Sequence, residues 1–320
     1  MRWLPHCVRL LDLHHVNTDP LWRAKVVAAL AIVYLMWGST YLVIRIGVAE
    51  LPPGLFAGSR LAIAGLLLIA YARWRGQAIG QAISDWRILL VTAVLMLVLA
   101  NGLVVWGEQW LPSNQAALLV TTAALWIAGL GTLGPQGHAL APRILIGLTL
   151  GFVGAALLLV PAGPMLLEQF AAQLAILFAA LAWASGSIYM KRVRPATPPL
   201  MFAGCQSFIA GAILCLMGVV AGEAPRWVWN PAALSALAYL IVFGSCFAFA
   251  AYIWLVHEVS PAVLGTYAYV NPLVAVVLGW WLLDEALGDL QVAGMVITLA
   301  GVLLVTLPQA RRAPVDVPHT

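Results

Sequence analysis

The chain has 320 residues, of which 63% are hydrophobic and 9% are charged, with a formal net charge of +4. A soluble domain carries about 25% charged residues because its exterior must be wetted, so this composition excludes a soluble globular fold. It predicts a polytopic membrane protein, in which the basic excess follows membrane topology and does not indicate nucleic-acid binding.

Residues 1–24 lack the uninterrupted apolar core of a secretory signal, and we expect them to form a cytoplasmic tail. Apolar stretches of about 20 residues, enough to cross the hydrocarbon core as helices, then recur ten times. Helices are expected because every backbone polar group in lipid must be paired internally. The predicted spans are 25–46, 54–74, 86–107, 113–132, 142–161, 170–191, 199–221, 232–256, 261–283 and 288–308, and a second tail follows at 309–320.

The stretch from Trp37 to Gly65 returns 146 positions later, from Trp183 to Gly211. The matched positions include Trp37 with Trp183, Arg45 with Lys191, Pro52-Pro53 with Pro198-Pro199, and Phe56-Ala57-Gly58 with Phe202-Ala203-Gly204. The chain therefore contains two repeats, 25–162 and 163–308, of five spans each. Because five is odd, the second repeat must be inverted relative to the first, an arrangement that underlies alternating access.

The basic residues favour an orientation with both termini in the cytoplasm. That orientation places 13 of the 16 Lys and Arg residues inside and only Arg45, Arg60 and Arg226 outside. It also predicts that Arg45 caps its helix on the outer side, while Lys191 caps the equivalent helix on the inner side.

Transport needs a polar lining inside an apolar protein, so polar residues within the spans are candidates for substrate binding. In span one, Trp37 and Tyr41 share a helix face, with Thr40 beside them. In span six, Trp183 and Ser187 occupy the matching positions. Aromatic side chains with polar tips suit organic substrates that carry a ring and an amine or carboxylate. Packing between helices or an interfacial aromatic belt is the alternative for both tryptophans.

Span three adds Asn101 and Glu108, which lie seven residues apart and therefore on one helix face. A partly buried carboxylate titrates at a raised pKa, so Glu108 could take up a proton or pair with a substrate amine. The alternative is a solvated residue at the outer end of the helix.

Spans four and nine carry a similar spacing, with Thr122 and Trp126 in one and Tyr267 and Asn271 in the other. Pro272 frees a backbone carbonyl that a substrate could use. We interpret Asn271 as a substrate ligand, with a structural hydrogen bond to a neighbouring helix as the alternative.

The chain resembles the drug/metabolite transporter superfamily, and specifically EamA-family exporters of bacterial inner membranes, over residues 28–308. The segments that carry the resemblance are WGSTYLVIRIGVAELPP (37–53), NG with GEQWLPS (101–113), FGS (243–245) and VSPAVLGTYAYVNPLVAVVLG (259–279). The resemblance implies ten helices in two EamA repeats, cytoplasmic termini and efflux of small metabolites.

Two features depart from the family pattern. Ala124-Leu125-Trp126 stands where the first repeat often has Pro-Leu-Trp, which puts a helix break in span four in doubt. Gly137-His138 replaces the acidic motif that commonly follows span four, whereas the second repeat keeps Asp284-Glu285.

The apolar spans, the inverted repeat and the polar positions within the spans predict a secondary transporter that works by alternating access. The resemblance implies that it exports amino acids or amphipathic drug-like compounds across a bacterial inner membrane. No motif for a nucleotide, a metal or another cofactor is present, and nucleic acid is not an expected partner. The expected partners are a small-molecule substrate and the lipid bilayer, while proton coupling and a monomeric or homodimeric state stay open. An intramembrane enzyme and a channel are the alternatives, and the inverted repeat within one chain favours the transporter.

Overall fold

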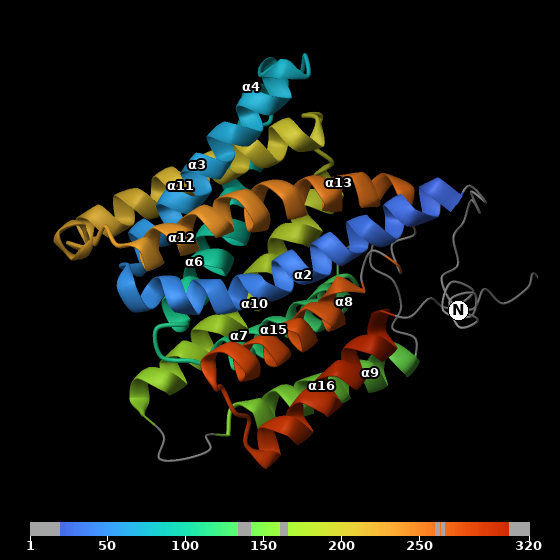
Figure 1. Cartoon of the computed structure of the whole chain (residues 1–320). Helices are drawn as coiled ribbons and strands as arrows, with labels where there is room; N and C mark the ends of the chain where they lie inside the picture. The colour runs from blue at the N-terminus through green and yellow to red at the C-terminus, as the bar shows by residue number, and fades with distance from the viewer. Residues whose placement is uncertain (1–19, 134–141, 161–165, 260–262, 264–265, 307–320) are drawn as a thin grey trace, which may run out of the picture.

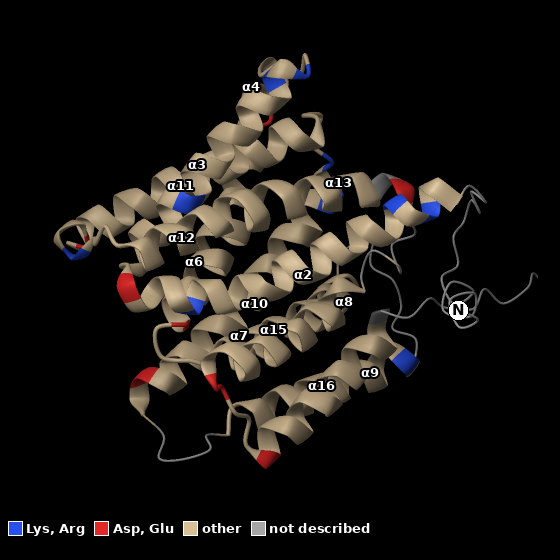
Figure 2. Ribbon diagram, viewed as in Figure 1, with Lys and Arg blue, Asp and Glu red and all other residues tan. Residues whose placement is uncertain are grey.

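The computed structural model describes residues 20–133, 142–160, 166–259, 263 and 266–306, and these residues are helical apart from short connections (Figure 1). The predicted C-terminal tail and most of the N-terminal tail lie outside the described residues. Figure 2 shows long uncharged stretches of helix, with most charged residues near helix ends. This distribution fits a bundle of helices that cross a membrane.

The helices of the first repeat follow the predicted spans. They are α2 (Pro20–Glu50), α3 (Pro53–Trp74), the short α4 (Gly80–Ser84), α5 (Trp86–Thr92) continued by η1 (Ala93–Asn101) and α6 (Gly102–Gly107), α7 (Ser113–Val120) with α8 (Thr122–Leu130), and α9 (Pro142–Leu158). Helix α2 begins at Pro20, five residues before the predicted start. Its 31 residues extend over about 46 Å, more than the hydrocarbon core of about 30 Å.

The second repeat has the same order of elements. These are α10 (Leu167–Val193), α11 (Pro199–Val220), the short η2 (Ala224–Arg226), α12 (Pro231–Tyr239) continued by η3 (Leu240–Phe247) and α13 (Ala248–Glu258), α15 (Tyr267–Leu283) and α16 (Asp289–Thr306). By length and composition, 7 helices among the described residues can cross a membrane, and shorter apolar helices cover 142–158, 267–283 and 289–305. Together they account for the ten predicted spans.

Helices α3 and α11 pack against each other along their length (Figure 1). A methyl group added to a glycine of either helix would meet the other helix at a matched series of positions. The pairs are Gly58 with Cys215, Gly211 with Ala62, Gly65 with Phe208, and Gly204 with Ile69. Each step forward along α3 is a step backward along α11, so the helices are antiparallel. Adding 146 to the residue number on α3 and subtracting 146 from the number on α11 converts each of these contacts into another contact of the series. This relation is expected when a two-fold axis relates two inverted repeats.

Helices α9 and α16 repeat this arrangement at the other edge of the bundle (Figure 1). The corresponding pairs are Gly147 with Val305, Gly154 with Thr298, Gly294 with Leu158, and Gly301 with Gly151. Here a shift of 147 positions exchanges the members of each contact. The predicted inversion of the repeats is therefore confirmed by two independent helix pairs.

The close approach of α3 and α11 gives a first testable prediction. A Cβ atom on Gly65 would lie 2.5 Å from the amide nitrogen of Phe208 and 2.8 Å from the carbonyl oxygen of Gly204. Because both atoms belong to backbone, Gly65→Ala must push the helices apart, at a cost of about 1–3 kcal/mol in unfolding free energy. Thermal unfolding in detergent should show a lowered midpoint. Gly129→Ala is the control, since nothing lies within 4 Å of that Cβ position, and an equal loss there would contradict the explanation.

In the α3–α11 pair, a loop carboxylate that follows each helix accepts hydrogen bonds at the start of the other helix. Glu223, after α11, accepts hydrogen bonds from the amides of Gly54 (3.2 Å) and Leu55 (2.8 Å) at the start of α3. Asp85, after α3, accepts from the amide (2.8 Å) and hydroxyl (2.6 Å) of Thr197, just before α11. The hydroxyl hydrogen bond is the main cause that holds the pKa of Asp85 below its usual range, so this contact weakens as the pH falls.

Backbone irregularities occur at equivalent places in the two repeats. Spans three and eight each contain a π-helical segment, η1 and η3, whose starts are 147 residues apart. Span four divides at Thr121, although it lacks the family's proline. The hydroxyls of Thr121 and Thr122 bond to carbonyls three residues earlier, which weakens the regular helix ladder there. In contrast, α15 continues through Pro272.

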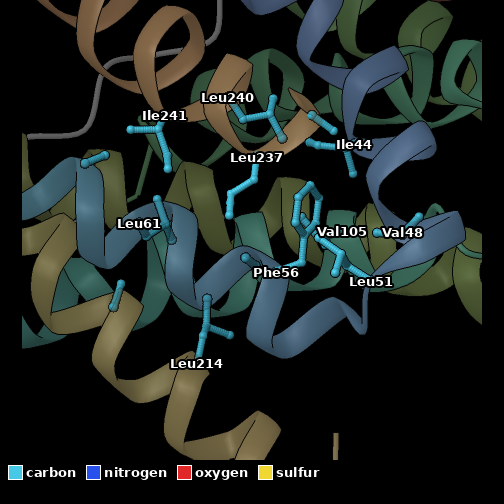
Figure 3. Close-up of a cluster of buried hydrophobic side chains, with 14 of the residues drawn as sticks. Ile44, Val48, Leu51, Phe56, Leu61, Val105, Leu214, Leu237, Leu240 and Ile241 are labelled. Atoms are coloured by element: carbon cyan, nitrogen blue, oxygen red, sulfur yellow. The ribbon is translucent and has the colours of Figure 1, made fainter. Parts of the chain in front are cut away.

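An apolar core holds the ends of α2 and α3 together with α11 and α12. Figure 3 shows the fully buried Phe56 close to Leu51 and Val105, with Ile44 and Leu237 nearby. The turn that brings Phe56 into this core depends on Pro52, whose extended backbone ends α2 and leads into α3.

Candidate functional site

One face of α2 connects an aromatic cluster to a charged cluster. Trp37, Tyr41 and Arg45 follow each other at intervals of four residues, so their side chains leave the same face. The distance along the helix from Trp37 to Arg45 is about 12 Å. Helix α2 passes between α13 and α15 (Figure 1), so this face meets elements of the second repeat.

The aromatic cluster consists of Trp37, Tyr252 and Tyr267, which come from three helices. The ring centroid of Trp37 lies 5.1 Å from that of Tyr252 and 5.5 Å from that of Tyr267, and the two tyrosine rings are 5.9 Å apart in an edge-to-face arrangement. The indole nitrogen of Trp37 donates a hydrogen bond to the carbonyl of Gly244 at 3.0 Å. Trp37 is therefore fixed by contacts with α13, α15 and the π-helical segment η3. Tyr252 was not among the predicted site residues.

The charged cluster is centred on Glu108, which follows α6 and has no exposed surface. Its carboxylate interacts electrostatically with Arg45, Arg60 and Glu285. Within the described part of the chain, neither carboxylate oxygen has a hydrogen-bond partner. The interpretation of Glu108 as a solvated residue at a helix end is therefore wrong.

Arg45 does not cap its own helix as predicted. It lies five residues before the end of α2, and its guanidinium donates to the backbone carbonyl of Glu108. Arg45 thus caps the C-terminal end of α6, where a cation is favourable because the last helix carbonyls are unpaired. Lys191 does lie in the last turn of its own helix, α10.

Arg60 is the second cation of the cluster, and the sequence analysis used it only for orientation. It is 6% exposed within α3, and its Nε donates to the hydroxyl of Ser245 at 3.2 Å. Among the described residues, its Nη1 atom has no hydrogen-bond partner. An arginine in the second turn of an apolar span is a signal that could have identified this position.

The hydroxyls of three predicted site residues bond to backbone carbonyls three or four residues earlier in the chain. Thr40 donates to the carbonyl of Trp37 (2.5 Å), Thr122 to that of Leu119 (2.7 Å) and Ser187 to that of Trp183 (2.7 Å). Trp183 itself packs against the same apolar cluster as Tyr41, so these two predicted residues lie along one core.

Three other predicted residues carry buried polar atoms without a partner in the described part of the chain. These atoms are Asn101 Oδ1, Trp126 Nε1 and Asn271 Oδ1. Trp126 packs edge-on against Phe152 of α9, with ring centroids 4.8 Å apart, and therefore belongs to a different packing environment from the Trp37 cluster. Asn271 is next to α2, because a Cβ on Gly38 would lie 3.1 Å from its carbonyl oxygen. Unpaired buried polar atoms indicate places where water or a ligand is needed.

A family model covers nearly all of this helical region. The model of the EamA-like transporter family matches twice, at residues 24–160 and 170–307, once for each repeat. The chain belongs to the EamA-like transporter family.

Similar proteins support this membership. The EamA protein is 36% identical over 286 residues to the uncharacterized inner membrane transporter YedA of Escherichia coli (strain K12), which covers 87% of this chain and 90% of YedA. It is 26% identical over 300 residues to the uncharacterized transporter YvbV of Bacillus subtilis (strain 168), covering 91% and 95%. A crystal structure with 20% sequence identity superposes with a TM-score of 0.64 over 88% of this chain and 97% of that chain, which supports the fold alone.

The EamA membership defines this chain as a multi-pass membrane transporter and not an enzyme. Beside the α2 face the structure places the aromatic rings of Trp37 and Tyr267 and, about 12 Å further along α2, the buried charged group Glu108 next to Arg45. Aromatic faces bind rings and cations, and a buried carboxylate binds an amine or a proton.

Proposed function

We propose that this EamA protein exports small organic solutes, either amino acids or amphipathic drug-like compounds, across the inner membrane of a bacterium. It works as a secondary transporter, with both termini in the cytoplasm. The repeats run over 25–162 and 163–308, between cytoplasmic tails at 1–24 and 309–320.

The observation that carries this proposal is the two-fold symmetry of the contacts within the α3–α11 and α9–α16 pairs. Two inverted copies of one sequence can adopt two packings of similar energy, one open to each side of the membrane. The glycine contacts bring the backbones of each pair together, so these pairs move little and supply the frame. The α2 face lies against α13 and α15 of the other repeat, and movement of these helices relative to α2 within the frame exposes the face first to one side and then to the other.

The chemistry along α2 supports an organic substrate that has both apolar and polar parts. Trp37 and Tyr267 supply ring faces, and the unpaired amide oxygen of Asn271 lies on α15, the same helix as Tyr267. Arg45 lies further along the same α2 face, where Glu108 from the end of α6 and Arg60 from α3 meet it. A substrate with a ring and an amine would contact both clusters, and a proton on Glu108 would link transport to the pH gradient.

A flux screen in proteoliposomes tests the proposal. The purified protein should move amino acids or cationic dyes, and a pH gradient distinguishes proton-coupled export from downhill efflux. Trp37→Ala and Asn271→Ala should each reduce the flux of the transported class at least tenfold, because each removes a predicted substrate contact. Trp281→Ala is the matched control, since that tryptophan is 69% exposed on the same helix as Asn271. Full flux in both site variants would contradict the assignment of the site.

A further inference from the structure

A groove of about 550 Å³ lies between the first turns of α2 and the last turns of α13, away from the α2 face described above. Its walls come from both repeats, because α2 belongs to the first and α13 to the second. The residues that form it include Trp22, Lys25, Ala28, Ile32, Trp254 and Glu258.

The groove has one polar end. Glu258, the last residue of α13, accepts a hydrogen bond from the indole nitrogen of Trp22 at 2.7 Å, which fixes its carboxylate at the rim. Lys25 lies one turn further along α2 from Trp22 and is exposed. The rim therefore presents one positive side chain, Lys25 from α2, and one negative side chain, Glu258 from α13.

The rest of the groove is apolar, and its lining residues extend along α2 over about the thickness of one leaflet. Ala28 and Ala29 are small and leave space on the surface of α2, and Ile32 lines the part of the groove furthest along α2 from Trp22. From Trp22 to Ile32 the helix rises about 15 Å, which is half of the hydrocarbon thickness of about 30 Å. Trp22 and Trp254 supply the amphipathic rings that are typical of the boundary between headgroups and chains.

We propose that this groove binds phosphatidylethanolamine from the bilayer. The phosphate lies at Lys25, the ethanolamine ammonium donates hydrogen bonds to Glu258, and the first carbons of one acyl chain lie over Ala28 and Ala29. A headgroup of this type matches the rim because it carries both charges. A phosphatidylglycerol headgroup brings no cation to Glu258, and a choline headgroup has no N–H to donate to that carboxylate.

The bound lipid would contact α2 and α13 at the same time. It would therefore stabilise the arrangement of the two repeats at this end of the bundle, where α2 and α13 also share an apolar core around Leu30 and Leu255. The composition of the bilayer would then influence which arrangement of the repeats is populated.

Native mass spectrometry of the full chain in detergent tests the site directly, without a transport assay. Dioleoyl phosphatidylethanolamine, phosphatidylglycerol and phosphatidylcholine are added separately at equal concentration. We expect the ethanolamine lipid to give at least a fivefold larger fraction of single-lipid adduct than either of the others. Glu258→Gln should abolish this preference, because glutamine keeps an oxygen for Trp22 and removes the charge. Lys25→Met should weaken adducts of all three lipids.

Two further variants separate the groove from general lipid adhesion. Ala28→Phe should remove the specific adduct by filling the groove, while Lys191→Met and Glu168→Gln, two exposed positions on α10, should leave it unchanged. Equal binding of the three lipids by the parent chain would overturn the proposal. An ethanolamine preference that survives both Glu258→Gln and Ala28→Phe would also overturn it. Unchanged thermal unfolding midpoints of the variants show that a loss of binding is not a loss of fold.

Discussion

Replacing Glu108 with glutamine is expected to abolish the acceleration of transport by a pH gradient and to lower the free energy of unfolding by about 1–3 kcal/mol. Glu108 is completely buried and interacts electrostatically with Arg45 and Arg60. Arg60 is also buried, and water cannot replace the lost countercharge. Unfolding by titration with a denaturing detergent, together with substrate flux in proteoliposomes, measures the two effects.

A second substitution tests whether the loss comes from the unbalanced charge. The cluster contains two cations, Arg45 and Arg60, and two anions, Glu108 and Glu285. Glu108→Gln combined with Arg60→Gln restores the balance, so the double variant should be more stable than the sum of the single effects predicts. Glu168→Gln, at an exposed site in the first turn of α10, should leave stability and flux unchanged. Wild-type stability of the Glu108→Gln variant would refute the coupling of these charges.

The same variant decides the coupling role of Glu108. If a proton on this carboxylate drives export, a pH gradient should no longer accelerate flux through the folded Glu108→Gln variant. A residual flux that still responds fully to the gradient would assign coupling to another group. The stability and coupling results are independent, because a charge cluster can hold helices together without carrying a transported proton.

The architecture could be predicted from the sequence because it follows from local hydrophobicity and from the spacing of the repeat along the chain. The spans are visible as apolar stretches, and the inversion follows from a repeat of 146 residues that contains five spans. Pro52-Pro53 and Pro198-Pro199 predict their turns by local chemistry, and α3 and α11 begin at Pro53 and Pro199. Neither inference needs knowledge of which residues meet across the bundle.

The contacts of the site could not be predicted in the same way. The sequence shows that Arg60 is a charge in an apolar span, but it does not show that Arg60 and Arg45 both face Glu108. The π-helical segments η1 and η3 contain no proline and give no local signal. Tyr252 was missed because its partners, Trp37 and Tyr267, come from helices that are distant or separated by a loop in the chain.

Glu285→Ala is expected to release the start of α7 from the second repeat. The carboxylate of Glu285 accepts hydrogen bonds from the amide and hydroxyl of Ser113, both at 2.8 Å, and from the amide of Asn114 at 3.1 Å. A hydrogen bond to a charged group contributes about 1.5–3 kcal/mol, so amide hydrogen exchange at Ser113 and Asn114 should accelerate about tenfold or more. Hydrogen–deuterium exchange measured by mass spectrometry reports both positions.

The consequence should extend beyond α7, because this cap has no acidic counterpart in the first repeat. Glu223 and Asp85 cap the α3–α11 pair from both repeats, whereas Gly137-His138 stands in the sequence where the first repeat would match Asp284-Glu285. We therefore expect Glu285 to favour the arrangement in which the start of α7 is held against the second repeat. Its removal should also accelerate exchange in α15 around Asn271 and change the flux. Glu223→Ala is the matched control: it should accelerate exchange at Gly54 and Leu55 and leave α15 protected. If Glu223→Ala exposes α15 to the same degree, the two caps are equivalent, and Glu285 does not set the balance between the two arrangements.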